Sequence, residues 1–174
     1  INDGSTDETP NILENYKQLS ILNVPQNKGK GNALQLGFKA ALAHNFDYAL
    51  TIDSDGQHYP ADIPVFLEEL NAATEPVLLI GSRNMTHESV PKKSSFGNQF
   101  SNFWFQFETG IKLSDTQSGY RLYPLKHLPK KLFTKKVEFQ IEVIVTTACN
   151  NTSATNTPTH PPHHPHQTPP HPHP

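Results

Sequence analysis

The chain has 174 residues, enough for one domain of ordinary size, and its formal net charge of −2 argues against a basic surface for nucleic acid. The single cysteine, Cys149, excludes an intrachain disulfide and a cysteine-based metal site, so a reducing, cytoplasmic setting is the default expectation. No apolar run approaches the length of about 18 residues that a membrane-spanning helix needs.

Strand and helix patterns alternate from the first residue. Residues 1–5 read as the end of a strand and the turn after it, so we expect earlier residues to precede them. Residues 9–19 predict a helix that begins with Thr-Pro, and 19–24 is a short apolar run typical of a buried strand. A turn rich in Gly and Lys at 27–31 leads into a helix with an apolar stripe over 32–43.

The second half continues the alternation. Strands are predicted at 48–52 and at 77–80, and the second of them ends at residues 81–83. Helices are predicted at 60–70, with Ile63, Phe66, Leu67 and Leu70 inward, and at 94–109. A loop is predicted at 114–124, and a buried helix or strand at 137–148. This order favours an α/β layered fold with a mostly parallel sheet. Ligands of such sheets bind at the carboxyl ends of the strands, which places Asp3, Asp53 and Arg83 along one edge.

The last part of the chain, 149–174, has a different composition, dominated by Pro, His and Thr. Such a stretch cannot bury enough apolar surface to offset the entropy of folding, so we predict a disordered tail. Because the helix pattern stops abruptly near Ala148, we favour a shifted reading frame as the origin of the tail. Metal binding by its histidines is the less favoured alternative.

The strongest local signal for chemistry is a pair of aspartates after the strand at 48–52. Residues i and i+2 of an extended chain point the same way, so Asp53 and Asp55 are expected to converge on one cation, with Gln57 as a further oxygen ligand. Mg²⁺ and Mn²⁺ prefer such oxygen ligands and bridge substrate phosphates. A plain turn is the alternative. We assign His58 a structural or substrate-orienting role in preference to ligation.

Two earlier turns also carry candidates. Asp3 is placed to accept hydrogen bonds from a ribose or a base, whereas Asp7 is expected to cap the helix that follows. The turn at 27–31 lacks the spacing of a P-loop, but its glycines allow a close approach of backbone to a nucleotide, with a lysine near phosphate. An ordinary turn with exposed lysines is the competing interpretation.

The acceptor side is predicted from two further segments. Arg83 ends a strand and is placed to pair with phosphate. The polar segment 115–121 supplies a carboxylate and a guanidinium. Asp115 would be a general base for a hydroxyl acceptor, whereas with an ionised phosphate acceptor it would orient Arg121 or the acceptor. An ordinary surface turn remains open for this segment.

Five motifs, read in order, resemble those of the family 2 glycosyltransferases with the GT-A fold, in particular the dolichyl-phosphate mannosyltransferase and polyprenyl-phosphate sugar transferase branch. They are Asn2–Asp7, Asn27–Gly31, Asp53–His58, Gly81–Arg83 and Asp115–Arg121. The resemblance implies a Rossmann-like nucleotide-diphospho-sugar transferase fold. The expected catalytic domain covers 1–148, without the family's first strand and helix, and the tail covers 149–174.

The resemblance also implies a role for each motif. Nucleotide-sugar binding falls to Asp3, Gly4, Ser5, Lys30, Gly31 and Asp53. Binding of Mg²⁺ or Mn²⁺ falls to Asp53, Asp55 and Gln57. The acceptor phosphate is assigned to Arg83, Ser118 and Arg121, and catalysis to Asp55, Asp115 and Arg121. The implied reaction is inverting transfer from a GDP- or UDP-sugar to a polyprenyl phosphate or a hydroxyl.

A lipid acceptor implies peripheral association with the inner face of a membrane, and no nucleic-acid partner is expected. A small lysine cluster between residues 126 and 136 would suit such a surface, although a solvated face explains it equally well. Two alternatives stay open at this point. One is a nucleotidyltransferase, which shares metal-binding carboxylates on a similar sheet, and the other is an inactive fragment that binds nucleotide-sugar.

Overall fold

A computed structural model describes residues 1–56, 58–83, 106, 113, 118–129, 138–149 and 152–160. Its main sheet has the strand order β3-β5-β4-β6. The strands are β3 (Tyr48–Thr51), β4 (Val77–Arg83), β5 (Arg121–Pro124) and β6 (Ser153–Thr159). β5 runs antiparallel to both of its neighbours and β6 runs parallel to β4, so three of the four strands share one direction. The expectation of a mostly parallel α/β sheet is confirmed.

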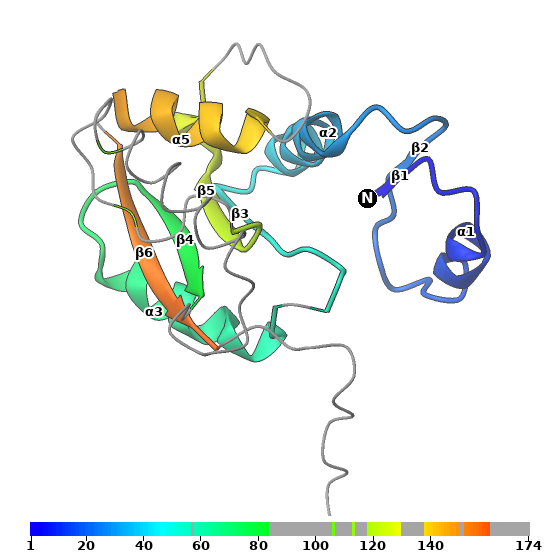
Figure 1. Ribbon diagram of the computed structural model, residues 1–174, viewed down its shortest axis with the longest axis horizontal. Helices are drawn as coiled ribbons and strands as arrows, with labels where there is room; N and C mark the ends of the chain where they lie inside the picture. The colour runs from blue at the N-terminus through cyan, green and yellow to red at the C-terminus, as the bar shows by residue number, and fades with distance from the viewer. Residues whose placement is uncertain are drawn as a thin grey trace, which may run out of the picture.

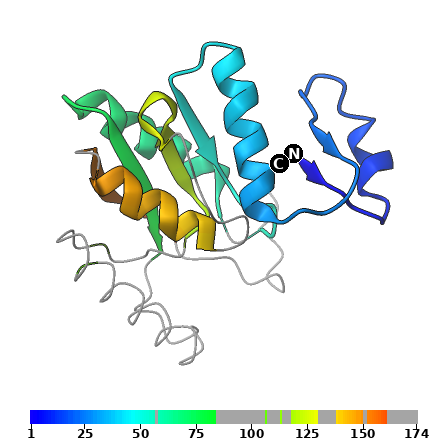
Figure 2. The same ribbon diagram turned by 90° about the horizontal axis from the view of Figure 1, so that it is seen from above.

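Helices cover both faces of this sheet (Figures 1 and 2). One face is covered by α2 (Lys30–Ala43) and α5 (Glu138–Cys149), and the other by the short helix η1 (Pro60–Asp62) and α3 (Ile63–Ala72). A second short helix, η2 (Leu125–His127), follows β5 directly.

The central strand β4 fills two cores because alternate side chains of a strand point to opposite faces. Leu78 and Ile80 pack with Phe38 of α2 and with the buried face of α5, whereas Val77 and Leu79 pack with Phe66 of α3. Both cores are built from side chains with almost no exposed surface. The sheet is therefore held rigidly between two helical layers, and its strand ends are fixed in position.

The first 29 residues form a small unit beyond α2 (Figures 1 and 2). Its strands β1 (Asn2–Asp3) and β2 (Asn23–Val24) pair in parallel, and α1 (Thr9–Leu13) connects them. The prediction of a buried strand over 19–24 is wrong for most of its length. Leu19 and Leu22 are 54% and 37% exposed, so this apolar run is not buried and only its last two residues pair.

Four outcomes concern the later elements. The predicted loop at 114–124 contains β5, whose residues are all buried. Leu67, expected inward, is 47% exposed, whereas Phe66, also expected inward, is fully buried in the core. The helix alternative for 137–148 is confirmed by α5. The helix predicted at 94–109 lies outside the described residues, apart from helical Gln106.

The stretch predicted as a disordered tail contains an ordered strand. Ser153–Thr159 pairs with β4 along seven residues, and Thr157 is fully buried there. Threonine suits strands well, and Pro158 is tolerated because β6 is the end strand of the sheet.

Among the helices that the structure describes, none combines the length and apolarity that crossing a bilayer requires.

Candidate functional site

The carboxyl end of β3 and the first residue of α2 meet through an ion pair. The Lys30 ammonium lies 2.7 Å from each carboxylate oxygen of Asp53. The two side chains are 36% and 32% exposed, so water and a ligand can reach the pair. Two residues that the sequence assigned to the nucleotide-sugar are therefore in direct contact.

A glycine lies directly against this pair. A Cβ placed on Gly119 would stand 2.1 Å from Oδ2 of Asp53, far inside contact distance, so only glycine leaves room for the carboxylate. The Thr51 hydroxyl donates a hydrogen bond of 3.0 Å to the Gly119 carbonyl. The end of β3 is thereby fixed to the segment that precedes β5.

The chain turns immediately after Asp53. Residues 54 and 55 form a turn and Gly56 has a φ of 77°, so the premise of an extended chain through Asp55 is wrong. Asp55 is exposed at this turn, close in sequence to the Asp53–Lys30 pair. Gln57, predicted as a third ligand, lies outside the described residues.

The carboxyl end of β1 is joined to the same helix. The Asp3 carboxylate accepts hydrogen bonds from the backbone N–H groups of Lys28, at 3.2 Å, and Gly29, at 3.0 Å. Gly4 has a φ of 70° and a Cβ there would stand 2.4 Å from the Asn27 nitrogen, which explains the glycine. Asp3 thus holds the loop whose next residue is Lys30.

The remaining donor-side residues are placed around these contacts. The Ser5 N–H donates to the Asn2 side chain at 3.1 Å, and Gly31 is buried in the first turn of α2. Asp7 accepts a hydrogen bond from the Thr9 N–H at the start of α1, as the capping interpretation predicted. The Thr9 hydroxyl and then its N–H hold the pKa of Asp7 below its ordinary value.

The strand register brings the acceptor-side residues to the same edge. Arg121 pairs with Thr51 of β3 and with Ile80 of β4, so the beginning of β5 lies where β3 ends and near the end of β4. Arg83 ends β4 at this edge. The ends of β3 and β4 lie at one edge of the sheet, as expected. Asp3 is not part of this sheet; it is linked to the same edge through the loop that leads into α2.

The side chains of the acceptor side are less open than expected. Arg121 has no exposed surface and its Nε donates to the Ser118 carbonyl at 2.6 Å. Ser118 is also buried, and its hydroxyl accepts from the Tyr120 N–H at 3.3 Å. Asp115 and the side chain of Arg83 lie outside what the structure describes.

Tyr120 is a buried residue that the sequence analysis did not select. Its hydroxyl donates to the Tyr59 carbonyl at 3.1 Å, and its ring packs 4.6 Å from Phe66 and 5.2 Å from His58, measured between centroids. Burial, with the nearby charge of Asp62, raises the pKa of Tyr120 to about 12. The sequence signal that could have identified Tyr120 was its place next to Gly119 within the polar segment 115–121.

Asp62 is buried at the start of α3 and accepts hydrogen bonds from His160, which follows β6.

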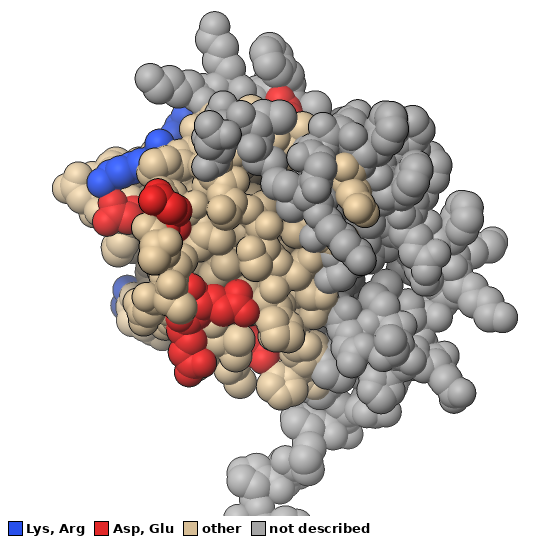
Figure 3. Space-filling view, turned by 90° about the vertical axis from the view of Figure 1, so that its left-hand side faces the viewer, with Lys and Arg blue, Asp and Glu red and all other residues tan. Residues whose placement is uncertain are grey.

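The face on the β6 side is mostly uncharged in its described part, with acidic side chains gathered along one edge (Figure 3). No extended basic surface is present among the described residues of this face.

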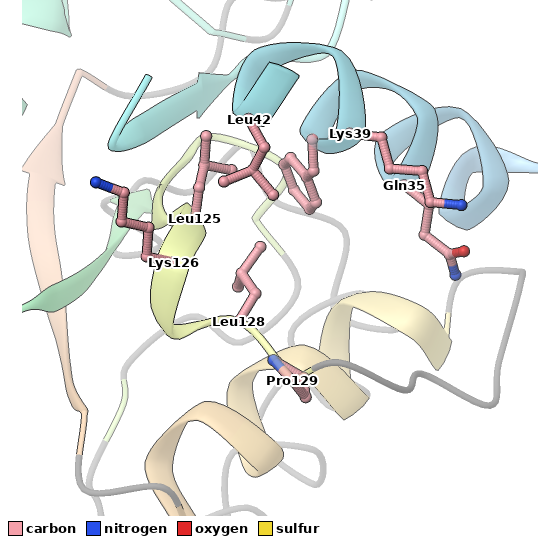
Figure 4. Close-up of a pocket in the computed structure, with 8 residues that line it drawn as sticks. Gln35, Lys39, Leu42, Leu125, Lys126, Leu128 and Pro129 are labelled. Carbon is pink, nitrogen blue, oxygen red and sulfur yellow. The ribbon is translucent and has the colours of Figure 1, made fainter. Parts of the chain in front are cut away.

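One cavity among the described residues lies away from these residues (Figure 4). It has a volume of about 360 Å³ and lies between α2 and the segment after β5, with an apolar lining of Phe38, Leu42, Leu125, Leu128 and Pro129. The Leu125 N–H donates to the Asp47 carbonyl just before β3, so this cavity is at the opposite end of β3 from Asp53. A second cavity of about 250 Å³ lies beside β1 and β2 and includes Asn2, Gly4 and Ser5.

The donor set at the end of β3 fits a hard divalent cation. Asp53 already faces a cationic group, and Asp55 adds a second, exposed carboxylate. Within the described ranges no three His, Cys, Asp or Glu side chains gather to enclose an ion. Mg²⁺ commonly takes only one or two protein carboxylates and completes its shell with water and substrate phosphates, so two aspartates suffice.

Comparisons with known proteins identify the family of the chain. Residues 1–129 match the family Glycosyl transferase family 2. The chain is 30% identical, over 172 residues, to the dolichyl-phosphate beta-glucosyltransferase of Saccharomyces cerevisiae, covering 83% of this chain and 50% of that protein. It is 29% identical, over 168 residues, to the UDP-N-acetylglucosamine–dolichyl-phosphate N-acetylglucosaminyltransferase of Methanococcus voltae, covering 83% and 66%.

The fold has a solved counterpart in glucosyl-3-phosphoglycerate synthase from Mycobacterium tuberculosis, in complex with Mn²⁺, UDP and phosphoglyceric acid. The TM-score is 0.64 with 16% identity, over 95% of this chain and 58% of that one. This likeness confirms the GT-A-like fold that the motifs implied.

The chain belongs to glycosyl transferase family 2, since the family match covers most of its length. It spans about half to two thirds of the length of the relatives that it matches. Family membership favours glycosyl transfer over nucleotidyl transfer as the chemistry of this fold.

Proposed function

We propose that the chain forms the donor-binding part of a glycosyltransferase that moves a sugar from a GDP- or UDP-sugar to a polyprenyl-type phosphate. The observation that carries this proposal is the contact of Lys30 with Asp53 at the end of β3, next to the exposed Asp55. Relatives named as dolichyl-phosphate sugar transferases support the acceptor class.

On the donor side, each residue has a distinct task in this proposal. Asp53 and Asp55 hold Mg²⁺ or Mn²⁺, which when bound neutralises charge on the departing nucleoside diphosphate. Lys30 pairs with a diphosphate oxygen when it leaves Asp53. Asp3 keeps the 27–29 backbone close to the nucleotide, and the cavity beside Gly4 and Ser5 accommodates part of it.

On the acceptor side, the proposal rests on where the candidate residues lie in the fold. Arg83, Ser118 and Arg121 belong to segments that start or end at the edge where β3 ends. The guanidinium of Arg83 suits a phosphate, whereas Ser118 and Arg121 are buried and support the acceptor side from beneath its surface. A lipid phosphate is already ionised near neutral pH and attacks without a general base. Asp115 then orients the acceptor or Arg121, and serves as a base only for a hydroxyl acceptor.

Transfer of label into the organic phase tests this proposal. The chain is incubated with Mn²⁺, polyprenyl phosphate, and labelled GDP-mannose or UDP-glucose. Asp55→Ala should reduce transfer by about a hundredfold or more, because a carboxylate at the reacting phosphates is lost. Asp47→Ala is the matched control, because this exposed aspartate pairs with Lys126 at the far end of β3. Equal transfer by Asp55→Ala and by the control would refute the assignment.

A further inference from the structure

We infer that Gly119 and Tyr120 are a pair of positioning residues that hold both ends of the connection between β3 and η1, and so prepare the aspartates for cation binding. The inference rests on the proposed function, because it concerns the same carboxylates. It adds two residues to which the proposed function assigns no contact with the cation or the sugar donor.

Gly119 acts at the Asp53 end. A Cβ at this position would stand 2.1 Å from Oδ2, 2.5 Å from Cγ and 2.7 Å from Oδ1 of Asp53, so the carboxylate occupies the space that a side chain at this position would need. The hydrogen bond from Thr51 to the Gly119 carbonyl keeps that backbone beside β3. Asp53 is thus confined between Gly119 on one side and Lys30 on the other.

Tyr120 acts at the Tyr59 end. Its hydroxyl donates to the Tyr59 carbonyl at 3.1 Å, and its ring contacts His58 on the same connection. The ring also packs against Phe66, which is fully buried in the core of α3. Because Gly119 and Tyr120 are adjacent, one short segment ahead of β5 fixes the connection at both ends and anchors it to the core.

The affinity of the full chain for Mn²⁺ alone tests the inference, measured from the electron paramagnetic resonance signal of free Mn²⁺ during a titration. Gly119→Ala should weaken binding about ten- to a hundredfold, as expected for loss of a supporting contact around a metal site. Tyr120→Phe removes one hydrogen bond and should weaken binding about two- to tenfold.

Two variants control for general loosening of the fold. Tyr123→Phe removes a buried hydroxyl that has no hydrogen-bond partner in the described part of the chain, and Gly37→Ala meets only the flexible Ile1 side chain. Both should keep the Mn²⁺ affinity of the wild type. The melting temperature of each variant shows whether it folds, and Tyr120→Phe decides the matter if Gly119→Ala does not.

The outcomes separate the two levels of the proposal. Wild-type Mn²⁺ affinity in folded Gly119→Ala or in Tyr120→Phe would overturn the positioning role alone. So would an equal loss of affinity in Tyr120→Phe and Tyr123→Phe, because that loss would reflect a loosened core. Failure of the wild-type chain to bind Mn²⁺ would overturn the proposed metal site together with the positioning role.

Discussion

Asp3 ends the strand β1, Asp53 follows the strand β3, and each precedes a glycine of positive φ, yet the partners of the two carboxylates differ in kind. Asp3 accepts hydrogen bonds from two backbone N–H groups, which are fixed in place by the chain. Asp53 faces the ammonium group of Lys30, at the end of a flexible side chain. Because Asp3 is held by backbone groups, it fixes the conformation of the loop before Lys30. Asp53 is held by the mobile ammonium group of Lys30 and can exchange this partner for a metal cation.

The largest expected effect comes from neutralising the exchangeable carboxylate. Asp53→Asn keeps the shape of the side chain but removes its charge, so we expect sugar transfer to fall about a hundredfold or more. The unfolding free energy should change by less than about 1 kcal/mol, because the Lys30 pair is partly exposed. The organic-phase assay and thermal unfolding check both parts. Full activity in this variant would remove Asp53 from the mechanism.

The backbone-held carboxylate should matter for folding instead. Asp3→Ala leaves the N–H groups of Lys28 and Gly29 without their acceptor, which should lower the unfolding free energy by about 1–2 kcal/mol. Urea denaturation measures this difference. If Asp3→Ala is no more destabilising than Asp47→Ala, the bonds to the loop do not contribute to stability and the contrast with Asp53 is lost.

Removing the ammonium group of Lys30 tests directly whether Asp53 can exchange its partner. Lys30→Ala should weaken binding of UDP or GDP in the presence of Mn²⁺ about tenfold, because a charged donor to phosphate is lost. Binding of Mn²⁺ alone should not weaken, since the competing ammonium is gone from Asp53. Isothermal titration calorimetry of both ligands provides the test, with Lys39→Ala on the same helix as control. Weaker Mn²⁺ binding in Lys30→Ala would contradict the exchange of partners.

The smallest effect is expected at a third aspartate, Asp7, which is fully exposed. Its folded-state pKa lies below the ordinary value of 3.8, so its contribution to stability is present above that pH and is lost as the pH falls through the lowered pKa. Asp7→Ala should therefore melt slightly below the wild type at neutral pH, and the difference should vanish as the pH falls through the lowered pKa. A difference that persists in acid would argue against the Thr9 hydrogen bonds as its cause.

Residues within one local motif were predictable from the sequence. Asp53 and Asp55 follow an apolar strand, and the helix after the Gly-Lys turn begins at Lys30. Both segments were assigned to one nucleotide site, but the contact of Lys30 with Asp53 was not predicted. The extended geometry assumed for Asp55 failed, because the chain turns as soon as it leaves the sheet.

Contacts that depend on strand register were beyond the sequence. The place of Gly119 against Asp53 requires β5 to lie between β3 and β4, and polar neighbours made its segment read as a loop. The strand β6 was missed for a related reason. Its composition predicts disorder, but β4 offers a complete row of backbone partners, and a threonine-rich segment can occupy it.

A crystal structure of the chain with Mg²⁺ and UDP or GDP would test the central claim most directly. The account predicts the cation at about 2.1 Å from carboxylate oxygens of Asp53 and Asp55, bridging to the diphosphate, with the Lys30 ammonium moved from Asp53 to a phosphate oxygen. A nucleotide bound elsewhere, or a cation at this edge that leaves the Lys30–Asp53 pair intact and touches neither aspartate, would contradict it.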